Sequence, residues 1–237
     1  METRIKLIAF DLDNTLVDFI RFKTISAYEA ISAMRDAGLP LTQQKGYECL
    51  MKTYWDVGIE SDEVLEEFFS RAGVSNDPKV LAAGIRQYQK IRSAFMNPYP
   101  RTIPTLIELI RRGFSLAILS DAPRLKAWKR LAEMRLMDFF DYVFTQEEVS
   151  EAKPSAMPFL TLLRKANISP FQAVMVGDNP LKDVQGAQNV GMIGILAQYG
   201  TESKLDNQLD QVNPDYVISA IDELLELDIL QSSSQDK

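Results

Sequence analysis

Two aspartates that follow a short apolar run are the residues best placed to do chemistry in this 237-residue chain. The run Ile5–Phe10 has the length and composition of a buried β-strand, and Asp11 and Asp13 come after it. Two carboxylates spaced two residues apart point to the same side of an extended segment, where each raises the pKa of the other. A bound divalent cation or a shared proton relieves this repulsion. The spacing therefore indicates a metal or acid/base site, although a solvated turn closing a strand has the same residues.

Polar residues of a matching kind occur at three other places along the chain. Ser120 and Asp121 follow a second apolar run, and Lys153 comes just before a predicted helix. Asp178 follows a third apolar run, and Asp183 lies five residues further on. Each residue alone is more often a helix cap, a surface lysine or part of a turn. Together they supply what phosphoryl transfer needs, namely a nucleophile, an acid/base, a phosphate clamp and a metal site.

The absence of histidine narrows the chemistry. The sequence has no histidine and one cysteine, Cys49. A Ser-His-Asp or Cys-His nucleophile is therefore excluded, and so is an imidazole-ligated zinc site. A metal in this chain would be bound by oxygen, which favours a hard cation such as Mg²⁺. Cys49 itself is expected to be a small buried apolar residue.

The charge balance argues against a nucleic-acid partner. The chain carries 33 acidic and 26 basic residues, a formal net charge of -7, whereas nucleic-acid binding normally needs a basic face. A single cysteine forms no internal disulfide, and the N-terminus enters a strand without an apolar leader or a long apolar run. We expect a cytoplasmic protein, either a monomer or a homodimer, with no membrane partner.

Beyond residue 98, apolar strands alternate with amphipathic helices. Strands are predicted at 114–119, 142–145, 173–176, 192–196 and 216–218, and helices at 103–110, 124–136, 155–166, 181–189 and up to about 227. This alternation is typical of an α/β fold with a parallel sheet covered on both faces. Ligands bind outside the carboxyl ends of the strands in such sheets, so the polar residues above are expected to share one site.

A helical segment, 18–97, separates the first strand from the others. Helices are predicted around 25–34, after Ser61, and after Asp77-Pro78, where an aspartate cap precedes a proline at the first helical position. The last of these helices should bury a stripe formed by Leu81, Ile85, Tyr88 and Phe95. We infer a core of 1–17 and 98–230, an inserted all-α cap domain of 18–97, and a polar tail, 231–237, that is disordered.

In chain order, these motifs resemble the haloacid dehalogenase superfamily, specifically its phosphatases with a helical cap between the first and second motifs. The matching residues are Asp11-x-Asp13-x-Thr15, Ser120, Lys153-Pro154 followed by Phe159, and Gly177-Asp178 with Asp183. The resemblance spans almost the whole chain. Leu119-Ser120-Asp121 with the downstream Lys126 and Trp128 is most similar to archaeal phosphatases described as acting on glyceraldehyde 3-phosphate.

The resemblance implies a Rossmann-like core and hydrolysis of a small phosphorylated metabolite through an aspartyl phosphate. It implies that Asp11 is the nucleophile and Asp13 the general acid/base. Mg²⁺ would be held by the Asp11 side chain, the backbone carbonyl of Asp13 and Asp178. The residues that would bind the phosphorylated substrate are Ser120, Asp121 and Lys153.

Other functions of the same fold stay open. The family's dehalogenases lack the second carboxylate, so Asp13 counts against that activity. A sugar-phosphate mutase would interconvert its substrates without net release of phosphate. A non-catalytic regulatory or binding protein could keep the fold, but retention of all the motifs argues against it. The cap segment carries no motif that identifies a substrate.

Overall fold

The computed structural model describes residues 5–61, 63–149, 151–201 and 211–231. Contacts divide the chain into two compact units, one made of Met1–Asp18 with Asn97–Lys237 and the other of Phe19–Met96. The first is the sheet-containing core and the second is helical. Residues 232–237 of the tail that was expected to be disordered lie outside the described residues.

The core is built on one parallel sheet of six strands, arranged in the order β3-β2-β1-β4-β5-β6. The strands are β1 (Leu7–Phe10), β2 (Ser115–Leu119), β3 (Tyr142–Phe144), β4 (Ala173–Gly177), β5 (Ile193–Ala197) and β6 (Tyr216–Ile218). Strands β1 and β4 are buried throughout, which explains why they read as continuous apolar runs. The predicted α/β fold with a parallel sheet is confirmed.

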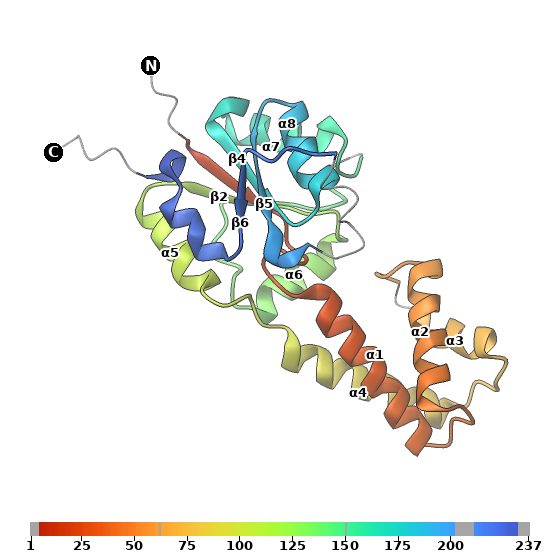
Figure 1. Cartoon of the computed structure of the whole chain (residues 1–237). Coiled ribbons are helices and arrows are strands. Elements are labelled where there is room, and N and C mark those ends of the chain that lie inside the picture. Colours follow the sequence, from red (N-terminus) through yellow and green to blue (C-terminus); the bar gives the residue numbers. More distant parts are fainter. Residues whose placement is uncertain (1–4, 62, 150, 202–210, 232–237) are drawn as a thin grey trace. The chain divides into compact units, whose positions relative to one another are not determined.

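Helices cover both faces of this sheet (Figure 1). Helices α5 (Thr102–Arg111) and α6 (Arg124–Glu133) lie on one face, and α7 (Ala156–Ala166) and α8 (Gly186–Asn189) lie on the other. Up to β3, each new strand is added on one side of β1, and from β4 onward each is added on the other side. Because the crossovers between parallel strands are right-handed, the connecting helices change from one face of the sheet to the other after β3. The reversal places a topological switch point between β1 and β4, where ligands of open α/β sheets bind.

The core elements begin and end where local chemistry predicts. Helix α5 is followed by Gly113, whose φ of +88° lies in the region that favours glycine. Helix α7 begins after Ser155, whose hydroxyl accepts a hydrogen bond from the Met157 N–H. The predicted final helix is wrong in type, because Ile221–Glu226 forms a 3-10 helix. The segment has only six residues and ends at Leu227, whose backbone is extended.

The second unit consists of four α-helices in its described part. They are α1 (Phe19–Asp36), α2 (Gln43–Val57), α3 (Val64–Ala72) and α4 (Pro78–Phe95). Asp77 caps α4 by accepting the Lys79 N–H, with Pro78 at the first helical position as predicted. The core of the unit contains Ile31, Met34, Leu50, Phe68 and Phe69, all almost fully buried. Cys49, expected to be buried, is only half-buried at its edge.

The predicted buried stripe of α4 is partly wrong. Ile85 and Phe95 are exposed, and the buried residues of α4 are Val80 and Gly84. A Cβ added to Gly84 would lie 2.2 Å from Met34 Cε on α1. The glycine therefore lets the two helices approach closely, and this contact turns the face marked by Val80 and Gly84 inward.

The chain leaves and re-enters the core through two segments that lie side by side. Val17 forms an isolated bridge with Pro98, and the Tyr99 N–H donates to the Leu16 carbonyl at 2.9 Å.

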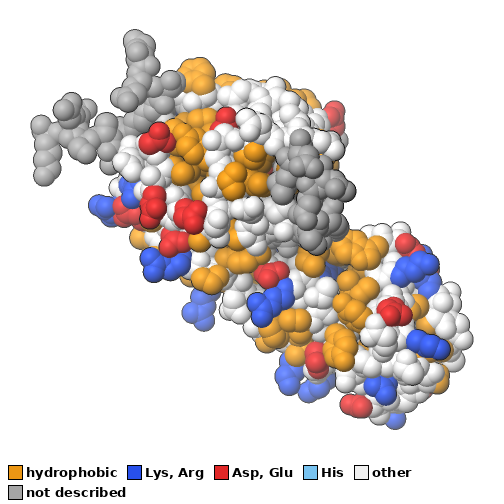
Figure 2. Space-filling view, in the orientation of Figure 1, with side chains coloured by type: hydrophobic (Ala, Val, Ile, Leu, Met, Phe, Trp, Pro, Cys, Tyr) orange, Lys and Arg blue, Asp and Glu red, His pale blue; other side chains and the backbone are white. Residues whose placement is uncertain are grey.

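On the face seen in Figure 2, acidic and basic side chains are interspersed over each unit. Among the described residues, we find no helix with both the length and the apolar character needed to cross a lipid bilayer.

Candidate active site

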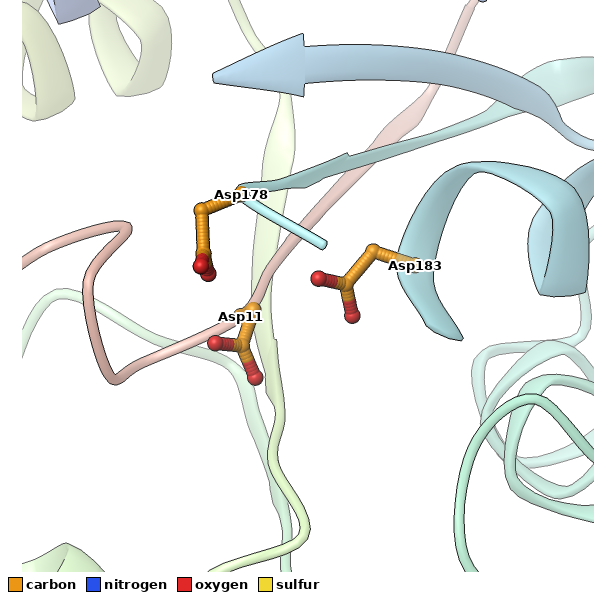
Figure 3. Close-up of side chains that lie close together, drawn as sticks. All are labelled: Asp11, Asp178 and Asp183. Carbon is orange, nitrogen blue, oxygen red and sulfur yellow. The ribbon is translucent and has the colours of Figure 1, made fainter. Parts of the chain in front are cut away.

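Three aspartates meet at the carboxyl edge of the sheet. Asp11 follows β1, Asp178 follows β4, and Asp183 lies in the π-helical segment Pro180–Gln185. Their carboxylates converge (Figure 3), and one oxygen from each lies within 4.8 Å of the others. Gly177 makes this approach possible, because an added Cβ there would lie only 2.3 Å from Asp183 Cβ. The glycine and the tight π-helical turn together bring Asp183 back to the strand end.

Lys153 neutralises part of this negative charge. Its Nζ lies 2.6 Å from Asp11 Oδ1 and 2.6 Å from Asp183 Oδ1, and it donates to the Leu119 carbonyl at 2.9 Å. The lysine is almost fully buried. Burial alone would lower the pKa of Lys153, but the Asp11 and Asp183 carboxylates outweigh it and raise that pKa above its usual value. Lys153 is therefore a fixed positive charge beside Asp11.

Asp11 and Asp178 both resist ionisation. Burial raises the pKa of Asp11 to about 7, opposed by Lys153 and reinforced by the carboxylates of Asp183 and Asp13. Burial, with the nearby carboxylates of Asp11 and Asp183, likewise raises the pKa of Asp178. One lysine does not balance the converging acids, so this cluster needs further positive charge to be fully ionised.

Asp13 forms an ion pair with a buried arginine. Its Oδ2 forms an ion pair with Nη1 of Arg130 at 3.0 Å. Arg130 comes from α6, and its side chain is 6% exposed, whereas that of Asp13 is 21% exposed. The carboxylate of Asp13 is thus directed to a buried guanidinium.

Ser120 and Asp121 both follow β2, as the sequence predicts. The Ser120 hydroxyl accepts the Ala122 N–H at 3.2 Å. Asp121 Oδ1 accepts the Lys153 N–H at 3.0 Å, and its Oδ2 pairs with Lys182 Nζ at 3.2 Å. The Asp121 carboxylate therefore holds the backbone of Lys153.

Thr15 and Tyr199 hold the turn after the first motif. The Asp178 N–H donates to Thr15 Oγ1 at 3.0 Å, and the Thr15 hydroxyl lies 3.2 Å from Asp178 Oδ1. The Tyr199 hydroxyl donates to the Thr15 carbonyl at 2.9 Å, and its ring packs edge-on against Tyr99. Sequence reasoning missed Tyr199, because a tyrosine after β5 matches no motif.

Of the predicted site residues, Asp11, Lys153 and Asp178 are brought together directly. Asp121 contacts Lys153, and Ser120 follows Leu119, whose carbonyl receives the Lys153 ammonium. Arg130 was not predicted, since nothing in the sequence of a helix marks a mid-helix arginine as a partner of Asp13. The arrangement offers buried carboxylate oxygens to a hard cation and a carboxylate nucleophile beside a lysine.

Residues 8–197 match the family model described as haloacid dehalogenase-like hydrolase. A glyceraldehyde 3-phosphate phosphatase from Methanocaldococcus jannaschii is 33% identical over 232 residues, which cover 98% of this chain and 100% of that protein. A phosphoglycolate phosphatase from Vibrio vulnificus is 28% identical over 234 residues, covering 95% of this chain and 97% of that protein.

The fold has close counterparts among solved structures. A crystal structure of a HAD phosphatase from Thermococcus onnurineus superimposes with a TM-score of 0.66 at 24% identity. The superposition covers 94% of this chain and 97% of that one, so the likeness extends over nearly the entire fold.

Proposed function

The chain belongs to the haloacid dehalogenase-like hydrolase family, and on that basis we propose that it is a Mg²⁺-dependent phosphatase of a small phosphorylated metabolite. The observation that carries the proposal is the convergence of Asp11, Asp178 and Asp183 beside Lys153 at the switch point of the sheet. The two curated relatives described above are both phosphatases, which supports the same reaction.

The donor set fits a magnesium ion. The converging ligand atoms are all carboxylate oxygens, which hard cations prefer. Asp11 and Asp178 would hold the ion together with the backbone carbonyl of Asp13. Both oxygens of Asp183 already have protein partners, Lys153 Nζ and the Asn179 N–H, so Asp183 orients the site. When bound, Mg²⁺ would draw negative charge from the phosphoryl oxygens.

Asp11 is the nucleophile in this proposal. Its carboxylate attacks phosphorus, the bond to the leaving oxygen breaks, and an aspartyl phosphate forms. Asp13 donates a proton to the leaving oxygen, then takes one from the water that attacks the aspartyl phosphate. Lys153 and Ser120 would hold the phosphoryl oxygens during both steps.

The helical unit Phe19–Met96 would act as a cap that supplies substrate recognition. Glyceraldehyde 3-phosphate is the first candidate substrate, supported by the relative that is 33% identical. Phosphoglycolate is the second, supported by the relative that is 28% identical.

The test is phosphate release from a panel of phosphorylated metabolites that includes both candidates, with p-nitrophenyl phosphate as a general substrate. We expect release in Mg²⁺, loss of release in EDTA, and recovery on adding Mg²⁺. Asp178→Asn should lose most of the activity, whereas Asp138→Asn, an exposed aspartate outside the site, should keep it. Full turnover in chelator would overturn the metal dependence, and interconversion of substrates without phosphate release would indicate a mutase.

A further inference from the structure

Arg130 interrupts the apolar face of α6. The other buried residues of this helix are Ala127 and Leu131, and Arg130 lies on the same buried face. Burying a guanidinium costs free energy, and replacing a buried ion pair by apolar residues is often neutral or stabilising. Packing alone therefore gives α6 little reason to carry an arginine at this position.

The buried guanidinium of Arg130 is paired with the carboxylate of Asp13. Nη1 of Arg130 lies 3.0 Å from Oδ2 of Asp13. The two residues are far apart in the sequence, so α6 and the end of β1 must both be in place before the pair forms. The ion pair thus ties the Asp13 carboxylate to a side chain that is itself buried.

We propose that Arg130 is a positioning residue for Asp13, holding its carboxylate in the orientation from which it transfers a proton in both halves of the reaction. This inference rests on the proposed function. The guanidinium stays charged throughout, so it can hold the Asp13 carboxyl group in one orientation for both steps. In the first step, the proton passes from the Asp13 carboxyl group to the leaving oxygen as the bond between that oxygen and phosphorus breaks. In the second step, the Asp13 carboxylate takes a proton from water as the water oxygen attacks phosphorus and the bond between phosphorus and the Asp11 oxygen breaks.

The test compares two substrates whose leaving groups differ in their need for a proton. This comparison separates proton transfer from the other parts of catalysis. An alkoxide must be protonated as it leaves, whereas p-nitrophenolate is stable without a proton. For Arg130→Met, phosphoenzyme formation from an alkyl phosphate should slow by about 10- to 100-fold, the cost expected when a catalytic group is misplaced. Formation from p-nitrophenyl phosphate should stay within about 3-fold of the wild-type rate, because no proton is needed.

The second half of the reaction gives an independent readout. Phosphoenzyme made from p-nitrophenyl phosphate should persist longer in Arg130→Met than in the wild type, because its hydrolysis needs Asp13. Rapid-quench mass spectrometry measures both rates. Arg124→Met is the matched control, since Arg124 lies on the same helix, pairs with Glu148, and is 52% exposed. It should behave like the wild type.

A conservative variant keeps the test decisive if Arg130→Met does not fold. Arg130→Lys retains a positive charge but loses the planar guanidinium, so it should show an intermediate alkyl-phosphate rate. In an Asp13→Asn background, changing Arg130 should have no further effect on the ratio of alkyl to p-nitrophenyl rates.

Three results would overturn the inference. Equal slowing with both leaving groups, in Arg130→Met or Arg130→Lys, would mean that Arg130 has a structural role only. Faster turnover would mean that the ion pair restrains Asp13 in an unproductive orientation. Failure of the wild-type protein to form any phosphoenzyme would remove the proposed function together with the role of Arg130.

Discussion

Thr15 and Asp178 are joined twice, although they lie 163 positions apart in the sequence. The Asp178 N–H donates to the Thr15 hydroxyl oxygen at 3.0 Å, and that hydroxyl lies 3.2 Å from Asp178 Oδ1. The first motif thus orients a carboxylate of the last one. Asp178 lies in the turn between Gly177 and the π-helical segment, and its carbonyl accepts the Thr201 hydroxyl at 2.8 Å.

Removing the Thr15 hydroxyl should therefore weaken metal binding. For Thr15→Val, we expect the affinity for Mg²⁺ to fall by about 10- to 100-fold, the usual cost of losing a group that orients a metal ligand. Titration of activity with Mg²⁺ measures this change. Thr53→Val is the control, because the buried Thr53 hydroxyl donates to the Cys49 carbonyl within its own helix, α2. An unchanged magnesium affinity in Thr15→Val would contradict the prediction.

Substitutions of Asp11 and Asp13 should block different steps of the reaction. Asp11→Asn should form no phosphoenzyme with any substrate, since its nucleophile is gone. Asp13→Asn should form the phosphoenzyme from p-nitrophenyl phosphate and hydrolyse it slowly, losing roughly 10²- to 10⁴-fold in turnover. Acid-quenched mass spectrometry detects the phosphorylated peptide. A phosphorylated peptide outside the first motif would show that the nucleophile is assigned wrongly.

Magnesium should stabilise the protein more strongly as the pH rises. Folding raises the pKa of Asp11 from 3.8 to about 7 and also raises that of Asp178. Between these pKa values the folded, metal-free protein binds more protons than the unfolded chain, so its stability falls as the pH rises. Mg²⁺ requires the ionised carboxylates, and competes with those protons at low pH.

Thermal denaturation with and without Mg²⁺ tests this linkage. The increase in Tm caused by Mg²⁺ should be small at a pH of about 5 and larger at about 8. Comparing the two curves at each pH removes the titration of groups distant from the site. In Asp178→Asn, the increase in Tm caused by Mg²⁺ should depend less on pH. A wild-type increase in Tm that is the same at both pH values would contradict the linkage.

Tyr199→Phe should destabilise the core. The change removes the hydroxyl that donates to the Thr15 carbonyl at 2.9 Å. This hydrogen bond is partly buried, and a typical intramolecular hydrogen bond contributes about 0.5 to 1.5 kcal/mol, so the free energy of unfolding should fall by that amount. Urea denaturation measures it, with Tyr28→Phe as the control because Tyr28 is 46% exposed. If the free energy of unfolding falls equally in the two variants, the hydrogen bond between Tyr199 and the Thr15 carbonyl does not stabilise the core.

The sequence predicted those parts of the site that follow from strand ends. Asp11 and Asp178 were expected to meet because the carboxyl ends of parallel strands share one edge, and the register of β1 and β4 brings them there. Arg130 could not be predicted, because its partner is fixed by the packing of α6 rather than by sequence spacing. The same holds for the buried face of α4, which Gly84 and its close contact with Met34 determine.

Helix α2 is another element whose boundaries the sequence did not predict. The sequence indicated a helical region but did not separate α2 from its neighbours. Its start is marked by Thr42, whose side chain accepts the Lys45 N–H, and its buried residues are Gly46, Leu50, Thr53 and Tyr54. A glycine and a threonine on the buried face weaken the apolar periodicity on which helix prediction depends.

The bridge between Val17 and Pro98 has a consequence for how such a protein can diversify. Since the two crossing points are already paired within the core, the intervening chain is an insertion whose ends are adjacent. The entropy of closing such an insertion grows slowly, by about 0.6 kcal/mol for each doubling of its length. Gene segments of different lengths could therefore be exchanged at this junction while the strands on either side keep their pairing. One catalytic framework could in this way acquire new substrates by recombination, without altering the residues that perform the reaction.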